Sequence, residues 1–190
     1  MAVEIRPESA SELSAYAAIP ASFLVTAVLD VARLADRFTL NERPVTRPYI
    51  KNYDASPANG PRAWAARFQV AQWAFFSARL NGSWVGAAAV APDPTLASGG
   101  GQGDAVLWDL RVAPSQRGRG IGSALFSAVE DWARSHGRRS LLAETQQINV
   151  AACRLYGSRG CGLEHVDTAA YPDFPDEVQL IWRKHLGAAS

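Results

Sequence analysis

A basic, glycine-rich turn joins a hydrophobic segment to an amphipathic one in this chain. Residues 109–122 read Asp-Leu-Arg-Val-Ala-Pro-Ser-Gln-Arg-Gly-Arg-Gly-Ile-Gly, and an amphipathic run over 123–136 follows directly. The first N–H groups of a helix have no partner within the helix and carry partial positive charge. Glycines let such a backbone close around an anion, and arginines add charge that suits a pyrophosphate. The segment predicts a strand, a phosphate-binding turn and a helix; an ordinary strand-to-helix turn is the alternative.

The spacing of the glycines excludes two common phosphate-binding motifs. Gly118, Gly120 and Gly122 lie two residues apart, which does not match the dinucleotide fingerprint G-x-G-x-x-G. No Gly-Lys-Ser/Thr follows, although the phosphate loop of nucleotide hydrolases requires it. What remains is the pattern Arg117-x-x-Gly120-x-Gly122 after a hydrophobic strand.

A second strand-to-helix segment comes next. The expected strand over 140–145 leads into a run that opens with Asn149, a good helix N-cap, and reaches a glycine stop at Gly160. Ala152 and Leu155 lie three residues apart on one face of this short helix. Tyr156 follows on the same helix, and a core-edge aromatic role is the alternative to a catalytic one.

These two segments resemble the acetyl-CoA-binding motifs of the GNAT family of N-acetyltransferases. The resemblance implies acetyl-CoA as the cofactor and assigns Tyr156 as the general acid that protonates the departing CoA thiolate. Cys161 stands where the family usually has phenylalanine. The residues that the resemblance assigns to acetyl-CoA are Leu110, Arg111, Val112, Arg117, Gly118, Arg119, Gly120, Ile121, Gly122, Ser123, Asn149, Ala152 and Tyr156.

Further segments are similar to the streptothricin acetyltransferases, in order from about Phe23 to Trp182. Residues 54–76 and 93–104 fit that pattern poorly. The resemblance implies a small cationic amine as substrate, with streptothricin and antibiotic resistance as the specific expectation. The similar segments are Pro48-Tyr-Ile-Lys-Asn-Tyr53, Glu144-Thr-Gln146, Asp167-x-x-x-Tyr171 and Glu177-x-x-Leu-x-Trp182. The residues expected around the amine are Tyr49, Tyr53, Asp109, Glu144, Asp167 and Tyr171.

Acetyl transfer to an amine needs a base, a group that polarises the thioester carbonyl and an acid. The backbone N–H of Leu110 can polarise the carbonyl. The candidates for the base are Asp109, Glu144, Asp167 and Glu177, of which Glu144 ranks first, and a water chain would serve equally well. Asp109 shares a strand face with Arg111, which favours a structural ion pair. Asp167, Asp173, Asp176 and Glu177 are four carboxylates that suit a cationic substrate, although a solvated turn has the same composition.

The expected fold class is α/β (α+β), as in the GNAT family. It is a mixed, mostly antiparallel sheet of about six to seven strands flanked by helices, in which the splayed parallel strands 106–112 and 140–145 form the acetyl-CoA slot. Asn81-Gly82 predicts a hairpin between 73–80 and 83–90. The pattern over 23–34 fits a helix or a strand, and the resemblance favours a strand.

Other segments complete the expected fold. The last strand, 178–185, is expected to pair on both edges, and 52–61 to form a loop. The loop over 92–103 is either a lid over the acyl end of the slot or a passive insertion. The helix over 123–136 buries Leu125, Val129 and Trp132, with Glu130, Asp131 and Arg134 away from that stripe.

Composition fits one globular domain over residues 1–190, and the resemblance implies that it is an N-acetyltransferase domain. The chain is 48% hydrophobic and 19% charged, which is ordinary for a globular domain. A net charge of +1 without a basic run argues against nucleic acid. No long apolar run or signal-peptide pattern is present, so the expectation is a cytoplasmic protein without a membrane partner.

Cys153 and Cys161 are expected to be free buried thiols, with no metal site. A protein or peptide N-acetyltransferase and a non-catalytic acyl-CoA-binding module remain as alternatives. The sequence is also compatible with a homodimer.

Overall fold

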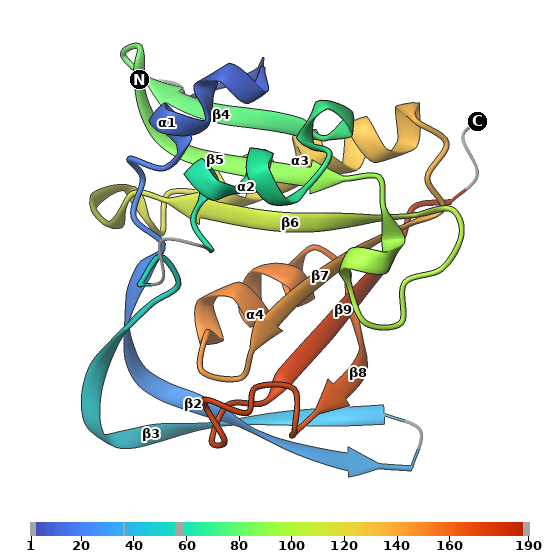
Figure 1. The fold of residues 1–190 in the computed structure, drawn as a ribbon. Helices are drawn as coiled ribbons and strands as arrows, with labels where there is room; N and C mark the ends of the chain where they lie inside the picture. The colour runs from blue at the N-terminus through green and yellow to red at the C-terminus, as the bar shows by residue number, and fades with distance from the viewer. Residues whose placement is uncertain (1–2, 36, 56–58, 188–190) are drawn as a thin grey trace.

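The computed structural model describes residues 3–35, 37–55 and 59–187. Over these residues, seven strands form the main sheet in the order β1-β4-β5-β6-β7-β9-β8, and β2 and β3 form a separate ribbon (Figure 1). The strands of the main sheet are β1 Glu4–Glu8, β4 Ala74–Leu80, β5 Ser83–Ala91, β6 Asp104–Val112, β7 Ser140–Gln146, β8 Gly162–Asp167 and β9 Gln179–His185. The ribbon is β2 Ser22–Leu34 and β3 Arg37–Asn52, and the helices are α1 Leu13–Tyr16, α2 Pro61–Arg67, α3 Ile121–Ser135 and α4 Val150–Ser158.

Strands β6 and β7 are the parallel pair of an otherwise antiparallel main sheet, as predicted. They pair only from Asp104 to Leu107 and from Ser140 to Ala143. A bulge at Trp108 bends β6 where this pairing stops, because Val90 of β5 faces Leu107 and the preceding residue faces Asp109. The two strands therefore diverge beyond Leu107 and leave a slot between them.

Helices cover both faces of the sheet. Leu125 and Val129 of α3 pack in one core with Leu107 and Leu141, and α4 joins the same core through Tyr156. On the opposite face, α1 and α2 pack on β4 and β5 in a second core. Successive residues of a strand point to opposite faces, so Leu142, Glu144 and Gln146 face away from α3 and α4.

The β2–β3 ribbon crosses one end of the sheet beside β7 and β9 (Figure 1). It docks there through a backbone bond from Leu29 N to Gln147 O of 3.0 Å, and it buries Val25 and Leu29. Residues 23–34, whose pattern fitted either a helix or a strand, thus lie in strand β2. A two-stranded ribbon is marginal on its own, so this docking stabilises it.

Local signals placed several turns correctly. Asn81 and Gly82 have φ angles of 51° and 79°, as a tight hairpin turn requires, and Gly137 ends α3 with φ 66°. Helix α3 begins at Ile121, two residues before the predicted start. Helix α2 was not predicted, although Pro61 at its first turn is a start signal. The expected loop over 52–61 lies partly outside the described residues.

The loop over 92–103 is not a lid over the slot. It lies at the end of β6 where β6 and β7 pair, since Arg183 donates to Gly99 O at 3.0 Å and Gly101 N donates to Asp104 Oδ2 at 2.9 Å. Ala97 packs on the sheet against Val106. The loop is thus anchored at the opposite end of β6 from the glycine-rich turn over residues 117–122, which we call the anion turn.

Glu130 of α3 is buried, which corrects its predicted place away from the core. Its side chain is 2% exposed and accepts from Arg159 at 2.6 Å and Arg134 at 3.3 Å. Lys184 of β9 completes the cluster. This carboxylate therefore joins α3 to the end of α4 and to β9.

Cys153 and Cys161 are both buried and free, as predicted. Within the described part of the chain, no helix is long and apolar enough to cross a membrane.

Candidate active site

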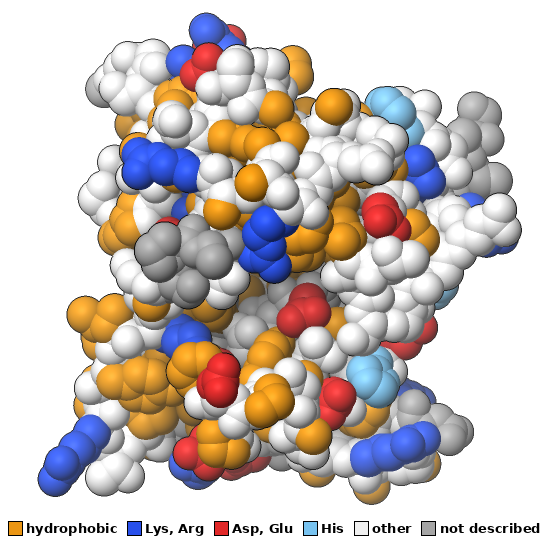
Figure 2. Space-filling view, in the orientation of Figure 1, with side chains coloured by type: hydrophobic (Ala, Val, Ile, Leu, Met, Phe, Trp, Pro, Cys, Tyr) orange, Lys and Arg blue, Asp and Glu red, His pale blue; other side chains and the backbone are white. Residues whose placement is uncertain are grey.

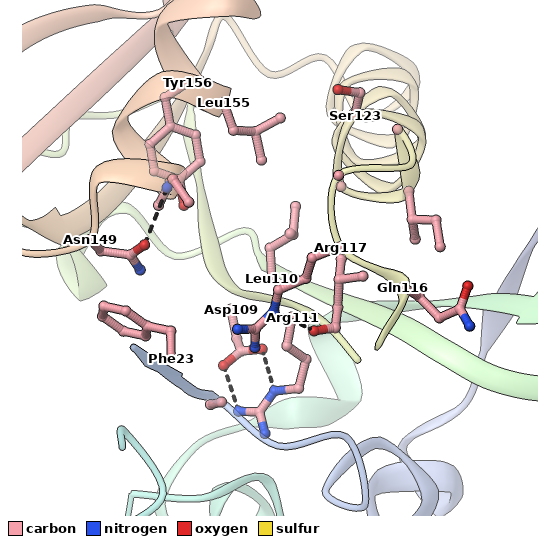
Figure 3. A pocket seen from close by; sticks show the side chains of 18 of the residues that line it. Phe23, Asp109, Leu110, Arg111, Gln116, Arg117, Ser123, Asn149, Leu155 and Tyr156 are labelled. Carbon is pink, nitrogen blue, oxygen red and sulfur yellow. Dashed lines mark hydrogen bonds and ion pairs between the residues drawn. The ribbon is translucent and has the colours of Figure 1, made fainter. Parts of the chain in front are cut away.

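A cavity of about 320 Å³ opens where β6 and β7 diverge (Figure 3). Its walls are the end of β6, the anion turn at the start of α3, the first turns of α4 and the base of the ribbon. Every residue predicted to contact acetyl-CoA lines it except Arg119, which is exposed between two lining glycines. Tyr53 and Asp109 from the predicted amine side line it too, whereas Tyr49, Glu144, Asp167 and Tyr171 do not.

The edge of β6 toward the slot offers backbone groups without a strand partner. The carbonyl of Arg111 lies against Gly86 of β5, so the peptide groups of Leu110 and Val112 point to the other side, into the slot. Consistent with this, the Val112 carbonyl accepts from Arg117 Nε at 3.0 Å. An extended amide chain could add to this edge as a strand would.

The anion turn leaves its amides open. Gly118 and Gly120 have φ angles of 73° and 80°, which favour glycine, and no heavy atom lies within 4 Å of a Cβ built at either position. The first bond of α3 runs from Ala124 N to Gly120 O, so the N–H groups of the three residues between them have no partner within the helix. These amides can bind a phosphate group.

We expect Gly120→Ala to weaken acetyl-CoA binding about ten-fold, because a methyl group would project into the anion seat. The matched control is Gly137→Ala at the other end of α3, where φ is 66° and the space is equally open. Both variants should lose about 1 kcal/mol of stability through left-handed strain. Calorimetric titration with acetyl-CoA measures the difference, and equal affinities in the two variants would remove the turn from the site.

Arg117 is not free to reach a pyrophosphate in this conformation. Besides the Val112 carbonyl, its guanidinium donates to Ser22 O of β2 at 2.7 Å. Arg117 therefore ties the ribbon to the anion turn, and the exposed Arg119 is the side-chain charge available beside the amides.

Tyr156 lies on α4 with its ring between Phe126 and Trp182, at centroid distances of 6.1 and 6.2 Å. It is 6% exposed, and burial raises the pKa of its hydroxyl well above the ordinary value for tyrosine. Among the described residues, none forms a hydrogen bond with this hydroxyl. Tyr156 is thus a protonated, unengaged donor on the wall of the cavity.

Asn149 and Tyr53 meet across the cavity from the anion turn. Asn149 caps α4 by accepting from Ala152 N at 3.2 Å, as predicted, and donates to the Tyr53 hydroxyl at 3.4 Å. That hydroxyl donates in turn to Gln146 Oε1. Tyr53, which follows the last residue of β3, is therefore fixed to the end of β7 and to the start of α4.

Glu144 lies on the face of the sheet opposite α3 and α4, because side chains alternate along β7. Figure 2 shows that the surface above the β2–β3 ribbon is hollowed. It is exposed and accepts from the Tyr171 hydroxyl at 2.8 Å. Burial, followed by the charge of Glu144, raises the pKa of Tyr171, which keeps it a donor to this carboxylate. Glu144 and Tyr156 therefore lie on opposite faces of the sheet, and of the two only Tyr156 lines the cavity.

The carboxylate of Asp109 is already engaged in an ion pair. Arg111 Nη2 and Nε bind its carboxylate at 2.7 and 2.9 Å, and the Tyr16 hydroxyl donates to it at 2.8 Å. The guanidinium of Arg111 also binds Asp54 at 3.0 Å. The structural ion pair expected for Asp109 is present, which leaves Glu144 as the freer carboxylate.

The four carboxylates of the predicted acidic cluster have different surroundings. Glu177 is buried and paired with Lys51 at 2.6 Å, and Phe174 lies against the same ammonium with its centroid at 3.8 Å. Asp167 accepts from Ala169 N at 2.7 Å and so closes its own turn. Asp173 and Asp176 are exposed, as in a solvated turn. Within the described residues, no group of His, Cys, Asp or Glu is arranged to hold a metal ion.

The residues present fit acetyl-CoA. A backbone edge that can pair with amides, an apolar wall at Leu110 and Leu155, and an open anion turn match a pantetheine arm followed by a pyrophosphate. Gly122 lies between these walls, where a Cβ would be 3.4 Å from Leu155, an ordinary van der Waals distance. The fold and the cavity together define an acyl-CoA-dependent transferase.

The chain belongs to the Acetyltransferase (GNAT) family, which matches residues 46–163. This confirms the family predicted from the two motifs, and the protein is an acetyl-CoA-dependent N-acetyltransferase.

Among curated relatives, the streptothricin acetyltransferase of Streptomyces lavendulae is 27% identical over 88% of this chain and 86% of its own length. Streptothricin acetyltransferase A of Bacillus subtilis is 35% identical, but that match spans 42% of this chain and about half (47%) of the relative. The crystal structure of nourseothricin acetyltransferase is 26% identical, with a TM-score of 0.76 over 98% of this chain and all of the other.

A candidate streptothricin acetyltransferase from Bacillus anthracis, solved in complex with acetyl coenzyme A, shares the fold. Its TM-score is 0.79 at 23% identity, over 97% of this chain and 99% of the other. These likenesses agree with the subfamily resemblance drawn from the sequence.

Proposed function

We propose that this enzyme transfers the acetyl group of acetyl-CoA to a primary amine of a small cationic substrate, with streptothricin as the first candidate. The observation that carries the proposal is the cavity beyond Leu107, which brings together the open amides of the anion turn, the unpaired edge of β6 and the Tyr156 side chain. Similarity to streptothricin acetyltransferases over most of the chain supports the substrate. Streptothricin acetylation would make this a resistance enzyme.

The residues divide the chemistry between two faces. Acetyl-CoA supplies the acetyl group as a thioester, and the amide N–H of Leu110 polarises its carbonyl. Glu144, held by Tyr171, takes the proton of the attacking amine directly or through water. The Tyr156 hydroxyl gives its proton to the leaving sulfur. Attack by the amine would be direct, with the base and the acid supplied by residues on opposite faces of the sheet.

The substrate is tested by measuring CoA-thiol release with a panel of streptothricin, aminoglycosides, polyamines, amino acids and short peptides. We expect release with streptothricin or another small cationic amine, and little with peptides. Release with peptides alone would favour a protein N-acetyltransferase. Acetyl-CoA binding without release from any amine would favour a non-catalytic module.

The base is tested by Glu144→Gln. Turnover should fall about ten-fold, at the low end for general-base catalysis, because water can also take the proton. The matched control is Glu164→Gln, which removes an exposed carboxylate from β8 and should leave turnover unchanged. Equal rates for Glu144→Gln and the control would show that Glu144 is not the base.

A further inference from the structure

Two aromatic rings close the end of the cavity that lies away from the anion turn. Phe23 of β2 and Tyr53, which directly follows β3, both line the cavity, with ring centroids 5.4 Å apart. In Figure 3, Phe23 lies beside Asn149 and across the cavity from Gln116 and Ser123. A cofactor whose pyrophosphate sits at the anion turn would therefore direct its acyl group toward these rings.

The backbone that carries Phe23 is held on both sides. Ala21 N donates to Asp54 Oδ2 at 3.1 Å, and Asp54 is fixed by Arg111. The carbonyl of Ser22 accepts from Arg117 of the anion turn at 2.7 Å. Phe23 itself faces Lys51 in the register of the ribbon. This segment cannot move away from the cavity without breaking bonds to β6 and to the anion turn.

The ring of Tyr53 is equally restrained. Its hydroxyl donates to Gln146 at the end of β7 and accepts from Asn149, the N-cap of α4. The Lys51 ammonium lies 6.0 Å from the centroid of the same ring and is itself held by Glu177. The wall made by Phe23 and Tyr53 is therefore held by hydrogen bonds to β6, the anion turn, Gln146 and Asn149.

We propose that Phe23 and Tyr53 set the length of the acyl group that the enzyme accepts, admitting acetyl and excluding longer chains. Added methylenes would have to displace packed and hydrogen-bonded side chains, which is unfavourable. The inference rests on the proposed function in one respect, namely that the acyl arm of CoA occupies this cavity.

The test measures binding and so needs no acceptor. Dissociation constants for CoA, acetyl-CoA, propionyl-CoA and butyryl-CoA are determined by calorimetric titration for the wild type, Phe23→Ala and Phe23→Leu. The wild type should bind butyryl-CoA about ten-fold more weakly than acetyl-CoA, as expected when methylenes are forced into a packed site. Phe23→Ala should abolish most of this difference, with Phe23→Leu between the two. Phe38→Ala, at the far end of the same ribbon, should retain the wild-type ratio.

Two results would overturn the proposed role of Phe23 and Tyr53 in limiting acyl length while leaving the proposed function intact. One is a wild type that binds butyryl-CoA as tightly as acetyl-CoA; the other is a Phe23→Ala variant that weakens every thioester equally. A folded wild type that binds no CoA thioester would overturn the proposed function and the proposed role of the two rings together.

Discussion

Replacing Tyr156 with phenylalanine should lower kcat by about two to three orders of magnitude and leave the affinity for acetyl-CoA unchanged. The variant keeps the ring between Phe126 and Trp182 and removes only a hydroxyl that has no partner among the described residues. The loss therefore falls on proton donation to the leaving thiolate. Steady-state CoA-thiol release and calorimetric titration measure the two quantities.

The matched control is Ser158→Ala, which removes an exposed hydroxyl from the same helix and should leave kcat unchanged. Because burial raises the pKa of Tyr156, the wild-type kcat should show no loss of this acid up to about pH 10, where an unperturbed tyrosine would ionise. A Tyr156→Phe enzyme that retains wild-type turnover would assign the residue to the core-edge role instead.

Glu130→Ala should lower the free energy of unfolding by about 3 kcal/mol, because it leaves Arg159 and Lys184 without the buried carboxylate that they share. For a chain of this size, the loss corresponds to a fall in Tm of about 6–12 °C. Thermal and urea unfolding measure it. Asp131→Ala, at the next position, removes a carboxylate that is 79% exposed and should change stability by less than about 0.5 kcal/mol.

The effect should depend on pH in a defined direction. Burial acts to raise the pKa of Glu130, but hydrogen bonds from Lys184 and Arg159 outweigh it and hold the pKa below its ordinary value. A carboxylate with a lowered pKa stabilises the fold above its unfolded-state pKa of about 4.3, and this contribution is lost as the pH falls through the folded-state pKa. The gap between wild type and Glu130→Ala should narrow below about pH 4. A gap that widened on acidification would contradict this account.

The cofactor side of the site was predictable because its signals are local. Alternating glycines fix the backbone of a turn, and an asparagine cap fixes the start of α4, so neighbouring residues in the sequence are enough to place these walls. The hairpin at Asn81-Gly82 was predictable for the same reason. The splay of β6 and β7 came from the family resemblance, and the bulge at Trp108 supplies its physical cause.

The acceptor side could not be predicted because its pairings are long-range. Lys51 reaches Glu177 and Tyr171 reaches Glu144 across separate elements, so a count of acidic residues could not show which carboxylates are already paired. Likewise, Glu130 reads as a solvent-facing residue on a helical wheel, and only the position of β9 shows why it is buried. The role of Phe23 carried no local signal beyond being the first residue of the subfamily match.

The ties between the ribbon and the slot bear on how far this protein can be shortened. The residues shared with the family, 46–163, begin within β3 and end within β8. A polypeptide trimmed to those limits would lose β2 with Phe23, and also β9, which lies between β7 and β8. Strand β7 would then present an open apolar edge of the kind that promotes aggregation. The range that matches the family is thus shorter than the part of the chain that we expect to be needed for folding and for enclosing the acyl group.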